Sequence, residues 1–412
     1  MAMYRHGNPT EILSPCGEEE SLDTALRYGA DAVYLAGKEF GMRTASKNFD
    51  YEQIKSSVVK AHEAGARLYV TCNTVPTNDE IKRLPQHFEI LDDIGVDAVI
   101  VADVGVMELA KKYAPKADIH MSTQTGIVNY HTANVLYNMG AKRVVLAREL
   151  SFENIAEIRE RVPKELEIEC FVHGAMCVSF SGRCLISAYM TGRDANRGDC
   201  AQPCRWKYHL FEENREGQYF PVEEDGDGTY LYNSRDMCMI DYIPRLAECG
   251  ITSFKIEGRA KSAYYTAVTT YAYRNAVDLY YKDRENYILP DWIRQELDKI
   301  SHREYSTGFF LGNEPGQVHS NGGYIREYDV VAVCNGYENG TAFITQKNKF
   351  LVGDELDVLP PKGKPFIINV QELYNSSGES VSSAPHAMEK LAMPCKTEIP
   401  SGSFIRKKRV LH

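Results

Sequence analysis

One phrase recurs five times in the first two-thirds of the chain and restricts its fold more than any other feature. It is a glycine, two or three small or polar residues, and an apolar run rich in β-branched residues. The copies are YGADAVYL from Tyr28, AGARLYVT from Ala64, IGVDAVIV from Ile94, MGAKRVVL from Met139 and CGITSFKI from Cys249. A glycine in the left-handed conformation commonly ends a helix. Each copy therefore predicts a helix end, a short loop and a buried strand, with Gly29, Gly65, Gly95, Gly140 and Gly250 as the caps.

Three further apolar segments lack the glycine phrase and complete a set of eight predicted strands. The strands lie at Glu11, Ala32, Leu68, Ala98, Ile119, Val144, Ile168 and Phe254. Helix-like segments separate most of them, and this alternation is typical of parallel strands covered by helices. Eight such units favour an α/β fold of the closed (β/α)8 TIM-like barrel type. An open parallel sheet is the alternative.

The one long interruption falls between the seventh and eighth strands, at residues 174–250, and is rich in cysteine. In a barrel it would be an insertion over the C-terminal face, where active sites lie. The predicted barrel with its insertion spans 1–282, and 283–321 is a helical or linker segment. From 322 to 412, short apolar runs are broken by Asn-Gly, Gly-Asp and Pro-Pro pairs, which predicts a small β-barrel domain.

Composition excludes several classes of protein. Hydrophobic residues make up 43% of the chain and charged residues 25%, which is typical of globular proteins and not of disordered or collagen-like chains. No apolar run of membrane-spanning length occurs, and the first residues lack the pattern of a signal peptide. We therefore expect a cytoplasmic protein that does not enter a membrane. The net charge of −10 gives no support to non-specific nucleic-acid binding, so any RNA contact requires a local basic patch.

Four of the eleven cysteines have a spacing that predicts a metal centre. Cys177, Cys184, Cys200 and Cys204 follow the pattern Cys-x6-Cys-x15-Cys-x3-Cys. A reducing compartment disfavours disulfides, and four thiolates suit an iron–sulfur cluster or zinc. Structural zinc usually takes tight cysteine pairs at both ends, so iron–sulfur is favoured and zinc is the alternative. Cys238 is a reserve ligand should Cys204 not bind, and free buried thiols are the remaining interpretation.

Polar residues follow several predicted strands, at the end where barrel enzymes place catalytic groups. Arg148, Lys255 and Arg259 together suit a small dicarboxylate, which arginine binds by charge-assisted hydrogen bonds. A ring of salt bridges with Glu149 and Glu257 is the rival interpretation. The candidate catalytic residues are Gln124, Arg148, His173, Glu257 and Arg259.

The cysteine-rich segment is also locally basic, and its aromatic residues Tyr189, Trp206 and Tyr208 are interleaved with the cations. This combination suits single-stranded or looped RNA, whose phosphates need cations and whose unstacked bases need aromatic faces. A solvated surface loop is the alternative. The candidate RNA-binding residues are Arg183, Arg193, Arg197, Arg205 and Lys207.

The segment ECFVHGAMCVSFSGRCLIS, which begins at Glu169, resembles the signature of the collagenase-like peptidases, peptidase family U32. The resemblance extends to EILSPCG, GADAVYLAGKEFGMRT, GDCAQPCRWKY, FKIEGRAKSAYY and EYSTGFFLG, and into the small C-terminal domain. It therefore covers most of the chain.

The resemblance is closest to the branch of this family that makes 5-hydroxyuridine at the wobble position of tRNA, using prephenate. It implies a 4Fe-4S cluster on Cys177, Cys184, Cys200 and Cys204. The implied activity is 5-hydroxylation of the wobble uridine in the anticodon loop of tRNA, with prephenate as co-substrate. Arg148 and Arg259 would then hold prephenate, and His173 and Glu257 would form the acid–base pair that moves the C5 proton.

Two other function classes stay open. The chain has neither an H-E-x-x-H helix nor a G-x-S-x-G elbow, so its residues give little support to the peptidase name. A peptidase would have to use Cys177 or Cys184 as a nucleophile beside His173. Those thiolates cannot both attack a peptide and hold a cluster. The third class is a non-catalytic, metal-stabilised RNA-binding module.

Overall fold

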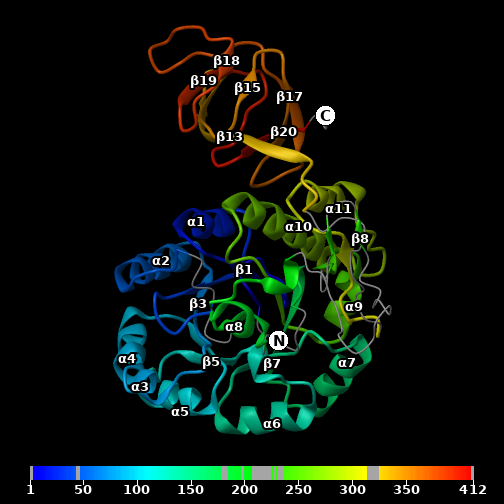
Figure 1. Ribbon diagram of the computed structural model, residues 1–412. Helices are drawn as coiled ribbons and strands as arrows, with labels where there is room; N and C mark the ends of the chain where they lie inside the picture. The colour runs from blue at the N-terminus through cyan, green and yellow to red at the C-terminus, as the bar shows by residue number, and fades with distance from the viewer. Residues whose placement is uncertain are drawn as a thin grey trace, which may run out of the picture.

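The computed structural model describes residues 3–42, 47–177, 184–195, 199–206, 224–225, 228–229, 235–312 and 324–409. Its larger part is a closed barrel of parallel strands surrounded by helices, which Figure 1 shows along the barrel axis. No helix among these residues is long and apolar enough to cross a lipid bilayer.

The eight predicted strands are confirmed and follow one another around the barrel. They are β1 (Glu11–Pro15), β2 (Ala32–Ala36), β3 (Arg67–Cys72), β4 (Ala98–Val101), β5 (Asp118–Met121), β6 (Arg143–Val145), β7 (Glu167–Ala175) and β11 (Ser253–Ile256). Parallel pairing of β11 with both β1 and β7 closes the ring. The alternative of an open sheet is therefore wrong.

Helices cover the outside of the barrel between successive strands. All five predicted cap glycines have positive φ angles, from 70° at Gly65 to 111° at Gly140. This conformation lets each helix stop and the chain turn directly into the next strand. The helices are α1 (Glu19–Arg27), α2 (Tyr51–Glu63), α3 (Asn78–Ile81), α4 (Leu84–Ile94), α5 (Val104–Tyr113), α6 (Tyr130–Met139), α7 (Phe152–Arg161), α9 (Ile243–Glu248), α10 (Ala263–Lys282) and α11 (Asp291–Asp298).

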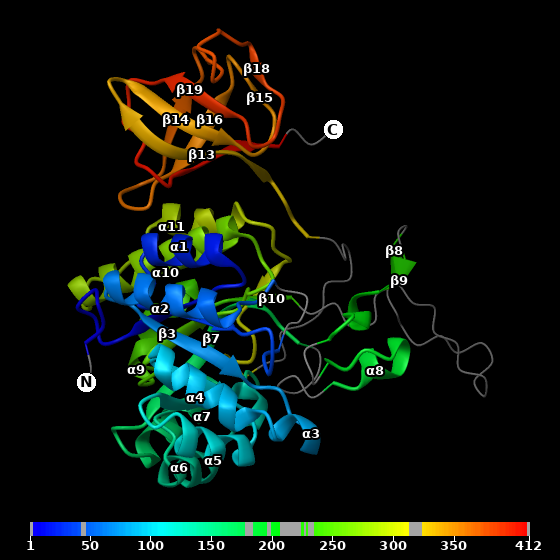
Figure 2. The same ribbon diagram turned by 90° about the vertical axis from the view of Figure 1, so that its left-hand side faces the viewer.

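The cysteine-rich insertion lies between β7 and β11, as expected, and projects beyond one end of the barrel (Figure 2). Its strand β10 pairs antiparallel with the end of β7 and parallel with β12, so the insertion continues the barrel sheet. Its described elements are α8 (Ile186–Thr191), η4 (Pro203–Arg205), β8 (Glu224–Asp225), β9 (Gly228–Thr229), β10 (Asp236–Cys238) and η5 (Ile240–Tyr242), and β12 is Tyr305–Ser306.

The C-terminal part is an antiparallel β domain that packs on α10 and α11. Its main sheet has the strand order β17-β16-β20-β13-β14-β19, and β15 pairs with β18. Arg406 joins it to the barrel through Glu296 at 2.6 Å and to its own sheet through Asp357 at 3.1 Å. The strands are β13 (Tyr328–Glu338), β14 (Thr341–Gln346), β15 (Phe350–Leu351), β16 (Glu355–Leu359), β17 (Phe366–Asn369), β18 (Ser383–Ala384), β19 (Lys390–Pro394) and β20 (Phe404–Lys408).

An ionic network fills the interior of the barrel. The fully buried Arg143 of β6 contacts Glu11 of β1 at 2.6 Å and, on β7, Glu167 at 2.6 Å and Glu169 at 2.9 Å. Lys255 of β11 contacts Glu169 at 2.6 Å. Buried carboxylates are stable only when they are paired and hydrogen-bonded, so these cations hold the strands in their order across the barrel.

We expect Arg143→Met to lower the free energy of unfolding by about 3–5 kcal/mol, because it leaves buried carboxylates without their cation. Denaturation with urea would measure the loss. Lys142→Met is the matched control, because Lys142 is exposed and adjacent in sequence, and it should change stability by less than about 0.5 kcal/mol. Equal effects of the two substitutions would contradict the role of the network.

Candidate functional site

A cavity of about 1140 Å3, partly open to solvent, lies at the ends of the barrel strands beneath the insertion. Residues of the barrel strands and their loops that line it are Tyr34, Met42, Thr71, Asn73, Ile100, Ser122, Thr123, Gln124, Val145, Arg148, Glu149, Phe171, Lys255, Glu257 and Arg259. The end of β7 and the insertion contribute Met176, Cys177, Cys184, Ile186, Ala195, Cys200, Pro203 and Cys204.

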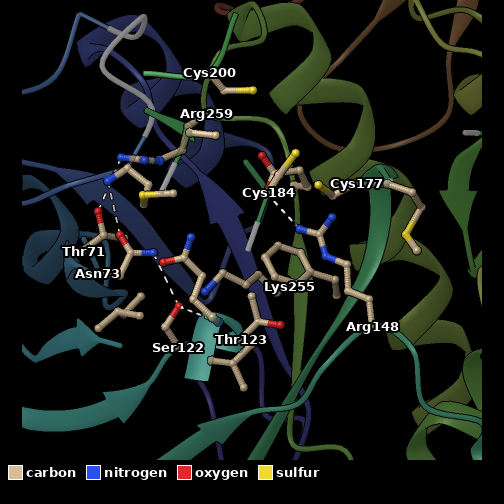
Figure 3. A pocket seen from close by; sticks show the side chains of 18 of the residues that line it. Thr71, Asn73, Ser122, Thr123, Arg148, Cys177, Cys184, Cys200, Lys255 and Arg259 are labelled. Atoms are coloured by element: carbon tan, nitrogen blue, oxygen red, sulfur yellow. Dashed lines mark hydrogen bonds and ion pairs between the residues drawn. The ribbon is translucent and has the colours of Figure 1, made fainter. Parts of the chain in front are cut away.

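All four cysteines of the predicted metal centre line this cavity. Cys177 is exposed, Cys184 is buried, and Cys200 and Cys204 are half-buried. Figure 3 shows Cys177, Cys184 and Cys200 at the same cavity as Arg148, Lys255 and Arg259. Among the described residues no three His, Cys, Asp or Glu side chains form a group that could hold a metal ion as they stand. Ligation would therefore draw the thiols together, as is usual where metal binding and folding are coupled.

The reserve ligand Cys238 does not line the cavity. It lies on β10, and burial raises the pKa of its thiol to about 12. Cys204 is therefore better placed than Cys238 to complete the set of four thiols.

Close backbone contacts position the residues around the cysteines. Gly174 has a φ angle of 109°, and a Cβ atom there would lie 2.6 Å from the carbonyl oxygen of Glu257. Only glycine fits this approach, which holds the end of β7 against the loop that follows β11. Within the insertion, the amide of Ala201 donates to Oγ of Ser187 at 2.9 Å, which ties the Cys200 segment to α8.

The two candidate arginines lie on opposite sides of the cavity, with Lys255 between them (Figure 3). Arg148 donates to the carbonyl oxygen of Ala175 at 2.8 Å and lies over the Phe171 ring, 3.8 Å from its centroid. Arg259 is buried and donates to Oγ1 of Thr71 at 3.4 Å. Two separated guanidinium groups are suited to an anion with two carboxylates.

The rival interpretation of salt bridges with Glu149 and Glu257 is realised in the pair of Arg148 with Glu257, whereas Lys255 pairs with a different carboxylate. Arg148 contacts the carboxylate of Glu257 at 3.2 Å, and Lys255 contacts Glu169 at 2.6 Å. The charge of Lys255 is therefore paired with a carboxylate of the barrel interior. The Arg148–Glu257 pair lies at the cavity wall, where a bound anion can compete for the guanidinium.

Gln124 and Glu257 also line the cavity, as their strand-end positions predicted. Gln124 lies in η1 (Thr123–Thr125), and its backbone amide donates to Oγ of Ser122 at 3.4 Å. The backbone amide of Glu257 donates to the carbonyl oxygen of His173, which ties the loop after β11 to the end of β7.

His173 does not line the cavity, in contrast to the expected acid–base pair with Glu257. A register shift in the β7–β11 pairing places Phe171 opposite Lys255 but His173 opposite Ile256. Such a bulge reverses the side on which the following residues point. The His173 ring therefore packs outside the barrel between Tyr265, Tyr273 and Tyr305.

The candidate RNA-binding cations are only partly within the described residues. Arg183, Arg197 and Lys207 lie outside them, and Arg205 is placed only by its backbone in η4. Arg193 pairs with Asp199 at 2.7 Å, and both side chains are about half exposed. Its charge is therefore compensated within the insertion.

Sequence reasoning missed Thr71, Tyr34 and Phe171, which line the cavity from within the strands. Side chains alternate along a strand, so Thr71 and Asn73 point to the same side of β3. Thr71 could therefore have been found from the sequence, because it is a polar residue two positions before the strand-end residue Asn73. Tyr34 and Phe171 carry no such signal, because buried aromatic residues are common in any strand core.

These features define a parallel β/α barrel whose catalytic end is covered by a cysteine-rich insertion. Residues 17–320 match the model of peptidase family U32, and residues 326–406 match that of the U32 C-terminal domain. The chain belongs to peptidase family U32.

Named relatives align with nearly the whole chain. It is 36% identical to tRNA hydroxylation protein P1 of Bacillus subtilis, over 96% of this chain and 94% of the relative. It is 34% identical to tRNA hydroxylation protein P of Escherichia coli, over 91% of each. It is 40% identical to an uncharacterised protease of Methanocaldococcus jannaschii, over 85% of this chain and 86% of the relative.

We expect His173 to make the fold sensitive to acid. Burial, with smaller contributions from His302 and Lys261, lowers the pKa of His173 to about 3. An unfolded chain takes up this proton near pH 6.5, so the stability from the neutral ring is complete above that pH and is lost as pH falls toward 3. In His173→Phe, unfolding free energies from urea titrations between pH 7.5 and pH 5 should fall less steeply, by up to about 1.4 kcal/mol per pH unit.

The control for this prediction is His386→Asn, which replaces an exposed histidine of the C-terminal domain and should leave the pH dependence unchanged. Identical slopes for the wild type and His173→Phe would show that His173 does not contribute.

Proposed function

We propose that this chain is a tRNA hydroxylase, which adds a hydroxyl group to C5 of the wobble uridine. The observation that carries the proposal is the convergence of four cysteines from the insertion and two arginines from the barrel on one cavity. Two relatives that align with 96% and 91% of this chain are named tRNA hydroxylation proteins. The wobble base is unpaired in the anticodon loop, so it can enter such a cavity without opening a duplex.

Cys177, Cys184, Cys200 and Cys204 would hold a 4Fe-4S cluster, with zinc as the alternative. Their thiol chemistry and their shared cavity fit either metal centre. Replacing the C5–H bond by C5–OH with oxygen from water releases two protons and two electrons, so the reaction needs an external two-electron acceptor. An iron–sulfur cluster would pass the electrons to that acceptor, which amino-acid side chains cannot do. This favours iron–sulfur over zinc, which has no redox chemistry in proteins.

The barrel side chains would bind and orient the small co-substrate. Arg148 and Arg259 would hold the two carboxylates of prephenate from opposite sides, with Lys255 between them (Figure 3). Glu257, which faces the cavity, replaces the His173–Glu257 pair as the group that takes the C5 proton. An anion that binds Arg148 would compete with the Glu257 carboxylate, 3.2 Å away, for the guanidinium.

A peptidase is the second candidate, favoured by the family name and by the Methanocaldococcus jannaschii relative. A cysteine peptidase needs an imidazole beside its thiol. No histidine is among the described residues that line the cavity, and the His173 ring lies on the outer side of β7. Casein cleavage that survives metal removal would favour this candidate. A non-catalytic RNA-binding module would bind tRNA and leave its wobble uridine unmodified.

We expect anaerobically purified protein to contain about four iron and four sulfide ions per chain. Replacing any one of the four cavity cysteines by serine should lower both contents and abolish 5-hydroxyuridine in tRNA from a complemented deletion strain, measured by nucleoside mass spectrometry. Cys395→Ser is the control, because this half-buried cysteine belongs to the C-terminal domain. Colourless, iron-free protein from anaerobic cells would refute the cluster.

We expect Arg259→Gln and Arg148→Gln each to weaken prephenate binding at least about tenfold, because each removes a charge-assisted hydrogen-bond donor. Isothermal titration of the purified protein would measure the affinity. Arg294→Gln is the control, since its exposed guanidinium pairs with Asp241 on the outer surface. Unchanged affinity in both cavity variants would remove prephenate from this site and leave the cluster assignment untouched.

A further inference from the structure

An exposed apolar and aromatic surface lies directly beside the cavity, on the insertion. Tyr189 is 88% exposed, Leu185 is 72% exposed and Trp206 is 42% exposed, and Met190 is also exposed. Exposed large apolar side chains gathered in one small region usually mark an interaction site. We call these four residues the mouth surface.

The mouth surface continues the wall of the cavity outward. Ile186 of α8 lines the cavity, and Tyr189 and Met190 lie three and four positions later, on the same side of the helix. Trp206 follows η4, whose Pro203 and Cys204 line the cavity as well. Both aromatic rings therefore come a few residues after a cavity cysteine, in segments that a hydrogen bond joins through Ala201 and Ser187.

We propose that Tyr189 and Trp206 are base-stacking residues that hold the nucleotides flanking the target base of a single-stranded RNA. This inference rests on the proposed function and adds residues to it. A base that enters the cavity leaves its neighbours without a stacking partner. An aromatic ring at the mouth replaces that partner for any base, because every base has a π-face.

The position and size of the mouth surface disfavour a protein partner. A protein seated on it would close the cavity that the substrate base must enter. Four side chains on a six-residue helix and a 3-10 turn also offer far less than the roughly 800 Å2 per partner of a stable protein interface. A strand of RNA needs only single rings as contacts.

The chain provides its own reporter for stacking on Trp206, because it contains only two tryptophans. Trp292 lies on α11, 5.9 Å from the ring of Tyr271, and can be replaced by phenylalanine. In Trp292→Phe protein, Trp206 fluorescence should be quenched by an RNA hairpin with the sequence of an anticodon stem-loop. Duplex RNA in which the same bases are paired should leave the emission unchanged.

Affinity for the same hairpin, measured by anisotropy of labelled RNA, tests Tyr189. Tyr189→Ala should weaken binding about tenfold, as expected for the loss of one stacked base. Tyr189→Phe keeps the ring and should bind within about twofold of the wild type. Phe343→Ala removes an exposed ring from the C-terminal domain and should leave the affinity unchanged.

The outcomes separate this inference from the proposed function. Hairpin binding with full affinity in Tyr189→Ala and no quenching of Trp206 would overturn the stacking role, while a tRNA hydroxylase remained possible. A wild-type chain that neither binds the hairpin nor restores 5-hydroxyuridine in the deletion strain would overturn both. A change from dimer to monomer in Tyr189→Ala would show instead that the mouth surface joins two copies of the chain.

Discussion

The pairing of Arg143 with buried carboxylates is the interaction on which the rest of the structure depends. The Arg143 guanidinium, on β6, contacts carboxylates of β1 and β7. One of these carboxylates, Glu169, also contacts Lys255 of β11. An unpaired carboxylate in this interior would be strongly unfavourable, so the strands have little freedom to shift. Lys255 is both the last member of this network and part of the cavity floor. The floor is therefore as rigid as the barrel itself.

Much of the fold could be predicted because its signals are local. A cap glycine, a short loop and an apolar run each depend only on adjacent residues, and all five cap glycines take the expected conformation. The strand-end rule likewise located Arg148, Glu257 and Arg259, because in a parallel barrel every strand delivers its last residues to one face. The spacing of the four cysteines directed attention to the segment that covers this face.

The rest of the site depends on contacts between segments far apart in the sequence. His173 was assigned to the cavity because it lies at the end of a predicted strand, but the bulge opposite Lys255 turns its ring outward, and nothing in the adjacent residues marks that bulge. Lys255 was grouped with two arginines as an anion-binding residue, but it pairs with Glu169 on the neighbouring strand. Arg193 was expected to face RNA and pairs with Asp199. Each case requires knowledge of register or loop closure.

Gly174 couples the two halves of the cavity. The chain leaves β7 there with a φ angle of 109° and passes so close to Glu257 that a Cβ atom would lie 2.6 Å from its carbonyl oxygen. Any side chain at this position would separate the strand that leads to Cys177 from the loop that carries Glu257 and Arg259. The backbone contact between Gly174 and Glu257 thus joins the segment that leads to the thiols with the loop that carries the polar groups of the barrel. Because Met237 of β10 also pairs with Gly174, a shift there would displace β10 of the insertion as well.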